Sequence, residues 1–205
     1  MKNVYITIFI LTSLLIVLNA KAQTTGEFYD EETGKTYKTV IIGKQIWMTQ
    51  NMDIKTDSNS YIFRSYSETD TSVNNAIYGR LYEWETAQDL CPFGWHLPNK
   101  AEWEKLIDHL GGKSVAGGKL KETGTEHWTA PNGGATNESG FTALAGAYRF
   151  AKGTYYTIGY DAMFWSSTEN GRSNAWSLRI NFRSAEAMIF SYNKLNANSV
   201  RCIKD

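Results

Sequence analysis

Cys91 and Cys202 are the only two cysteines in this chain of 205 residues, and they lie far apart in the sequence. An even number of cysteines in an oxidising compartment indicates a disulfide bond. This bond would close a loop of about 110 residues, for which chain entropy predicts roughly 4.7 kcal/mol of stabilisation. A pair of free buried thiols is the alternative. A redox-active pair is disfavoured, because the two residues lack Cys-x-x-Cys spacing.

The first residues have the pattern of a secretory signal peptide. Lys2 supplies a positive charge, residues 6–18 are mostly apolar, and Ala20-Lys21-Ala22 has the small-x-small form of a cleavage site. We therefore predict cleavage before Gln23 and a protein that is periplasmic, secreted or on the cell surface. An uncleaved N-terminal anchor is the alternative, although the apolar stretch is shorter than the ~20 residues of a typical membrane span.

The length and composition of the remaining chain predict one domain. Residues 1–22 are assigned to the signal peptide, 23–27 to a short tether and 28–205 to the domain, since no low-complexity linker divides them. Removing the signal leaves 19 basic and 21 acidic side chains. This balance gives no electrostatic reason to bind nucleic acid or an anionic membrane. No second hydrophobic segment predicts a membrane span in the mature chain.

Two local patterns give the clearest predictions of secondary structure. Residues 36–42 and 45–48 are predicted strands joined by a tight turn at Gly43-Lys44. A helix is predicted to follow Asn99, because Asn99 and Glu102 can form a capping box and apolar residues then recur at helical spacing.

Elsewhere the pattern predicts a second helix, long loops and short strands. Residues 80–90 are the second predicted helix, and residues 112–140 are predicted to be irregular. Further strands are predicted at residues 141–144, 147–150, 164–167, 175–182, 187–192 and 199–203. Together these elements predict an α+β domain, in which two helices pack on short, mostly antiparallel strands with long loops.

Ordered motifs occur along the whole chain, at residues 36–40, 46–51, 79–82, 91–103, 116–121, 134–144, 165–169 and 199–202. Together they resemble the Fibrobacter succinogenes major paralogous domain family over about residues 28–205. The resemblance implies an exported, mostly bacterial domain whose function is not established.

A wider similarity is to the C-type lectin-like fold, which formylglycine-generating-type domains share. In that fold a helix ending in a cysteine is followed by a second helix, and the cysteine is bridged to the last strand. Residues 84–91, residues 98–110 and Cys202 occur here in that order. This similarity implies a C-type lectin-like fold with a Cys91–Cys202 bond.

A calcium site is the first kind of site to consider in such a fold. Calcium-dependent sugar-binding members usually carry Glu-Pro-Asn or Gln-Pro-Asp in a long loop and Trp-Asn-Asp on a nearby strand, and this chain has none of these. Asn132, Asn137 and Glu138 offer a single carboxylate, whereas calcium usually takes about six to eight oxygen ligands, several of them carboxylates. We predict no metal and no cofactor, with calcium as the less favoured alternative.

No set of catalytic residues can be assembled from the sequence. His96, His109 and His127 lack metal-ligand spacing, and the chain has no Gly-x-Ser-x-Gly turn. Formylglycine generation requires reactive cysteines, whereas both cysteines here are assigned to the bridge. We therefore predict that the protein is not an enzyme.

Candidate ligand contacts lie in the loops between residues 112 and 174. Trp128 occurs in a polar, glycine-rich loop, where an aromatic ring suits recognition of a sugar or a peptide. The alternative is that Trp128 pins its loop to the body of the domain. The candidate set is Trp128, Asn132, Asn137, Tyr155, Tyr156, Arg172 and Asn174.

These observations favour an exported, non-catalytic recognition or adhesion module that binds a glycan or a protein through its loops. A structural or protein-binding component of a cell-surface assembly is the alternative. An enzyme of unidentified chemistry is the third possibility.

Overall fold

The computed structural model describes residues 23–57, 59–61, 76–146, 148–156 and 158–205. The predicted signal peptide, residues 1–22, lies outside these ranges, so its cleavage stays a prediction. None of the helices within the described ranges is long and apolar enough to cross a bilayer.

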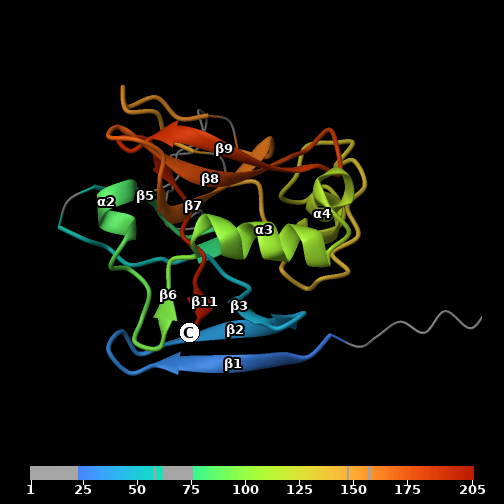
Figure 1. Cartoon of the computed structure of the whole chain (residues 1–205), viewed down its shortest axis with the longest axis horizontal. Helices are drawn as coiled ribbons and strands as arrows, with labels where there is room; N and C mark the ends of the chain where they lie inside the picture. The colour runs from blue at the N-terminus through green and yellow to red at the C-terminus, as the bar shows by residue number, and fades with distance from the viewer. Residues whose placement is uncertain (1–22, 58, 62–75, 147, 157) are drawn as a thin grey trace, which may run out of the picture.

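Strands make up most of the regular structure in these ranges (Figure 1). The strands are β1 (Thr25–Asp30), β2 (Lys35–Ile42), β3 (Gln45–Met48), β4 (Ser60–Tyr61), β5 (Leu81–Glu83), β6 (Trp95–His96), β7 (Asp161–Glu169), β8 (Asn174–Asn181), β9 (Ala187–Asn193), β10 (Ala197–Asn198) and β11 (Ile203–Lys204). The main helices are α2 (Trp84–Ala87), α3 (Lys100–His109) and α4 (Lys113–Leu120).

The strands form three antiparallel sheets. A five-stranded sheet has the order β1-β2-β3-β11-β6, and two three-stranded sheets have the orders β10-β5-β4 and β7-β8-β9. The predicted hairpin of β2 and β3 is confirmed, with Val40 opposite Trp47. Gly43 in its turn has φ = 64°, a conformation that glycine adopts without steric cost.

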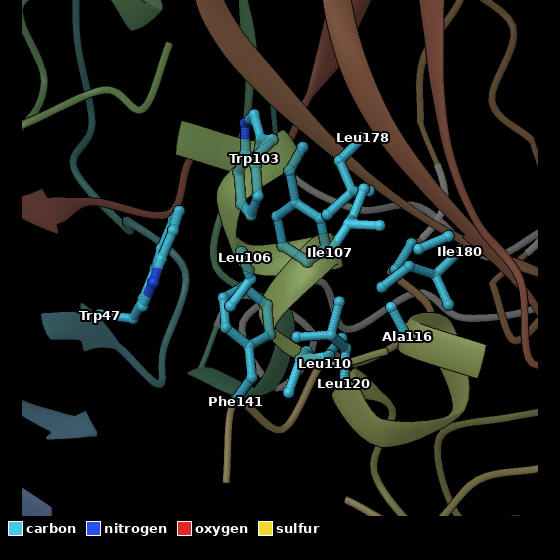
Figure 2. Close-up of a cluster of buried hydrophobic side chains, with 14 of the residues drawn as sticks. Trp47, Trp103, Leu106, Ile107, Leu110, Ala116, Leu120, Phe141, Leu178 and Ile180 are labelled. Atoms are coloured by element: carbon cyan, nitrogen blue, oxygen red, sulfur yellow. The ribbon is translucent and has the colours of Figure 1, made fainter. Parts of the chain in front are cut away.

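Helix α3 lies between the five-stranded sheet and the β7-β8-β9 sheet (Figure 1). Its predicted capping box is present: Glu102 N donates to Asn99 Oδ1 at 3.0 Å, and Asn99 N donates to Glu102 Oε2 at 2.8 Å. The helix buries Trp103, whose ring stacks on Trp47 with centroids 4.6 Å apart. Figure 2 shows how α3 contributes to one core with both sheets; the labelled core residues are Trp47, Trp103, Leu106, Ile107, Leu110, Ala116, Leu120, Phe141, Leu178 and Ile180.

The predicted disulfide bond joins Cys91 to Cys202, with Cα atoms 5.8 Å apart. This pairing excludes the alternative of free thiols. The bond connects the segment before β6 to the segment before β11, and β11 pairs with both β3 and β6. The end of the described chain is therefore an integral part of the first sheet.

The predicted C-type lectin-like α+β fold is wrong for this chain. Three antiparallel sheets dominate the described residues, the helices are few and short, and no C-type lectin arrangement is evident. The predicted helix at residues 80–90 is instead strand β5 followed by the one-turn helix α2. Leu81 and Tyr82 are both buried, and β5 pairs with β10 on one side and β4 on the other. Pairing with distant strands therefore outweighs the local helical spacing.

Two further elements differ from the prediction. Helix α4 lies in the segment predicted to be irregular, and β1 includes residues 25–27, which were assigned to a tether. Gly117 and Gly118 let α4 approach its neighbours closely, because a Cβ atom at Gly117 would lie 2.1 Å from Glu186 O. Two adjacent glycines lower the helix propensity of this segment. Helix α4 therefore depends on tertiary packing, and the sequence pattern indicates it only weakly.

His96, in β6, connects the capping box of α3 to the residue after β11. Its Nε2 lies 2.9 Å from Glu102 Oε1, and its Nδ1 lies 2.6 Å from Asp205 Oδ1. Burial lowers the pKa of His96, but the hydrogen bonds and charges of Asp205 and Glu102 raise it by more, so the net pKa is raised above its usual value.

We expect the His96→Gln variant to be less stable than wild type near pH 6 and equally stable near pH 9. A raised native-state pKa gives a stabilisation that is complete below the unfolded-state pKa of about 6.5 and is lost as the pH rises through the native-state value. The difference near pH 6 should be below about 1 kcal/mol, since the pair is partly exposed. Urea unfolding across this pH range measures it, and a difference that did not change with pH would contradict the expectation.

Candidate functional site

Two of the predicted ligand residues, Trp128 and Asn132, are buried. Trp128 is 1% exposed, and its Nε1 donates to Ala143 O at 2.9 Å. Asn132 is 6% exposed, and its Nδ2 donates to Glu122 O and Gly124 O. Both buried side chains hold their loop to the domain, which favours the pinning alternative for Trp128, and ligand contact by either residue stays a prediction.

The other predicted residues do not form one group. Asn137 bonds to Thr142 beside β1 and β2, in the wall of a polar hollow of about 440 Å³. Arg172 is exposed between β7 and β8, and Asn174 begins β8 opposite Asn193. Tyr155 and Tyr156 belong to a different part of the surface from Asn137.

A patch of aromatic side chains lies on the side of the β7-β8-β9 sheet that faces away from α3. Leu178 and Ile180 of β8 point into the core with α3 (Figure 2). Side chains alternate along a strand, so Arg179 of β8 points to the opposite side. In the register of β8 and β9, Phe190 and Tyr192 lie on that same side as Arg179.

A short loop adds three more rings to this patch. Phe150 N donates to Thr154 O, and Tyr156 N donates to Tyr148 O, both at 2.8 Å, so residues 148–156 fold back on themselves. Tyr148 and Tyr156 stack with centroids 5.0 Å apart, and Tyr148 meets Phe150 and Tyr192 edge-on. We call this patch the aromatic face; it consists of Tyr148, Phe150, Tyr156, Phe190 and Tyr192.

The aromatic face offers ring surface to solvent. Phe150 is 38% and Phe190 is 40% exposed, Tyr156 and Tyr192 are half-buried, and Tyr148 is buried beneath them. Neighbouring aromatic side chains of this kind, with partly exposed rings and polar hydroxyls, are typical of recognition surfaces.

One ion pair lies within the aromatic face. Arg179 donates through Nε to Asp161 Oδ1 at 2.8 Å and through Nη2 to Asp161 Oδ2 at 3.1 Å. The Asp161 side chain is fully buried and also accepts from Asn181 Nδ2 at 2.9 Å, whereas the Arg179 side chain is 27% exposed. The carboxylate therefore holds the guanidinium in a fixed orientation at the surface.

The hydroxyls of Tyr148 and Tyr192 in the aromatic face stay protonated at neutral pH, because the pKa of each is raised. Burial, and then the neighbouring Tyr192 and Asp161, raise the pKa of Tyr148 to about 12. Burial also raises the pKa of Tyr192, against the opposing effect of Arg179. Both phenols can consequently donate as well as accept hydrogen bonds.

Among the described residues, no three His, Cys, Asp or Glu side chains lie close enough together to hold a metal ion. The two asparagines considered as calcium ligands use their side chains within the protein: Asn132 bonds to backbone carbonyls and Asn137 bonds to Thr142. Calcium prefers several carboxylate ligands, and neither asparagine belongs to such a group among the described residues.

Comparison with known proteins places the chain in a family. The sequence model of the family described as the Fibrobacter succinogenes major domain matches residues 40–204. The chain belongs to that family. No curated protein and no solved structure matches it. The matched segment contains the disulfide bond, α3 and the whole aromatic face of this chain.

Most of the aromatic face was missed by reasoning from the sequence. A signal was present, because alternation places Phe190 and Tyr192 on one side of a strand and Arg179 on one side of its neighbour. The pairing register that brings these strands together, and the loop that adds Tyr148, could not be deduced from the sequence alone.

Proposed function

We propose that this domain is an exported, non-catalytic recognition module that binds a glycan on its aromatic face. The disulfide bond is compatible with an oxidising compartment. The observation that carries the proposal is the Arg179–Asp161 pair set among partly exposed aromatic rings.

A glycan suits this chemistry. A sugar ring presents C–H faces that pack on aromatic rings and hydroxyls that accept and donate hydrogen bonds. Tyr156 and Tyr192 supply rigid rings with little side-chain entropy to lose on binding, and Arg179 supplies oriented donors. Phe150 and Phe190 are partly exposed, and such accessible rings suit a chain of sugars more than an enclosed small metabolite.

A protein partner is the second candidate, and strand β9 supports it. β9 pairs only with β8 among the described strands, so its other edge has no strand partner there and could pair with a strand of another protein. Phe190 on β9 and Leu195 just after it are 40% and 60% exposed. A structural component of a cell-surface assembly would use such an edge.

Binding of the purified, oxidised chain to a broad glycan array tests the proposal. We expect saturable binding to a subset of glycans, and we expect Tyr156→Ala and Tyr192→Ala each to weaken it about tenfold, since losing one central aromatic contact costs on the order of 1–2 kcal/mol.

Phe93→Ala is the matched control, because Phe93 is a fully exposed aromatic residue outside the aromatic face. This variant should bind as wild type does. If the folded protein binds no glycan on the array and co-purifies with a protein partner, the second candidate is favoured. Equal losses in all three variants would show that the aromatic face is not the site.

A further inference from the structure

The Arg179–Asp161 pair also bears on the charge of the ligand. We infer that the aromatic face selects uncharged sugars, whose hydroxyl and ring oxygens accept hydrogen bonds from Arg179. This inference rests on the proposed function, since it names the class of glycan that the same site would bind.

Arg179 has donors left over for a ligand. A guanidinium carries five N–H groups, and two of those in Arg179 are bonded to Asp161. The remaining three have no acceptor within the described part of the chain, although the side chain is partly exposed. Oriented donors at a surface, flanked by rings, are what a sugar oxygen requires.

The charge of Arg179 is already neutralised. Asp161 contacts the guanidinium through both carboxylate oxygens and is itself fully buried. A sugar carboxylate or sulfate at Arg179 would meet the negative charge of Asp161 directly behind the guanidinium, which offsets the attraction. An uncharged hydroxyl keeps the full charge-assisted hydrogen bond without that repulsion.

Two other arginines are stacked on aromatic rings. Arg149 stacks its guanidinium on Tyr61, 3.9 Å from the ring centroid, and Arg183 lies over Phe182 at 5.1 Å. Asn181 and the protonated hydroxyls of Tyr148 and Tyr192 add uncharged hydrogen-bonding groups beside Arg179. The interior of the aromatic face is consequently polar and close to neutral.

The test measures binding of the unaltered protein to pairs of oligosaccharides that differ only in charge. Each pair consists of a neutral hexose chain and the same chain bearing uronic acid or sulfate. We expect the neutral chains to bind at least tenfold more tightly. Their dissociation constant should change less than about twofold between ~0.05 and ~0.5 M NaCl, since no net charge is paired on binding. Tighter binding of the acidic chains, with an affinity that depends on the salt concentration, would overturn the inference and leave the proposed glycan binding intact. No binding of either kind would overturn both.

A substitution at Arg179 tests whether this residue is responsible for the binding of neutral chains. Arg179→Lys keeps the positive charge but loses the fork that engages Asp161, so neutral chains should bind about tenfold more weakly. Arg183→Lys is the matched control at an exposed arginine outside the aromatic face, and it should bind normally. Unchanged binding by a folded Arg179→Lys variant would contradict the role given to Arg179. The salt and charge comparison on the unaltered protein decides the ligand class even if this variant fails to fold.

Discussion

Replacing both Cys91 and Cys202 by alanine should lower the free energy of unfolding by about 4.7 kcal/mol. The bond joins residues 111 positions apart, so its loss frees a long loop in the unfolded chain. For a chain of this size the midpoint of thermal unfolding should fall by roughly 10–20 °C. Alanine is preferred to serine, because Cys202 is fully buried and a serine hydroxyl there would need a hydrogen-bond partner. Urea unfolding of the oxidised wild type and the variant measures the difference.

Two controls separate the bond from the side chains. Wild type under reducing conditions should lose as much stability as the double variant does. Cys91→Ala alone should lose a similar amount, since either change removes the bond. A double variant within about 1 kcal/mol of the oxidised wild type would show that the unfolded chain is not restricted by the bond as chain entropy predicts.

The second large effect is expected at Lys121, whose side chain is completely buried. Its Nζ donates to Gly133 O at 2.8 Å, Ser184 O at 2.9 Å and Asn181 O at 3.1 Å. It also lies 5.3 Å from the centroid of Trp128. One ammonium group therefore joins the loop after Trp128 to the end of β8 and the turn that follows it.

Lys121→Met should destabilise the protein by about 3 kcal/mol, because three buried carbonyl oxygens lose a charged donor while the volume is kept. Lys119→Met is the matched control two residues away. Lys119 pairs with the exposed Glu138 at 2.7 Å, and losing that pair should cost less than about 1 kcal/mol. Equal effects in the two variants, measured by urea unfolding, would rule out a special role for the Lys121 cluster.

Local patterns predicted those parts of the fold that local forces decide. The β2–β3 hairpin and α3 were predicted correctly, because a turn glycine and a capping box act within a few residues. The segment around Leu81 was predicted as a helix, and only its pairing with β4 and β10, far away in the sequence, makes it a strand. The predicted fold class was wrong for the same reason, because the sheet to which a strand belongs depends on partners that are distant in the sequence.

The positions of the candidate ligand residues also depend on distant contacts. Trp128 looks like a loop residue in the sequence, and its burial depends on contacts with Lys121 and Ala143 from other segments. Tyr156, one of the predicted residues, lies half-buried in an aromatic group and stacks on Tyr148. The other rings of the aromatic face come from β9 and from the same short loop, and no local pattern indicates that these segments meet.

The position of β11 also has a consequence for how the chain folds. β11 pairs with β3 on one side and β6 on the other, so the five-stranded sheet stays split until residues 203–204 are in place. A chain made from its N-terminus exposes the unpaired edges of β3 and β6 until residues 203–204 have been synthesised. Such long-range closure slows folding and leaves strand edges open to wrong partners. A chaperone that shields these edges during synthesis would therefore be expected to raise the yield of folded protein.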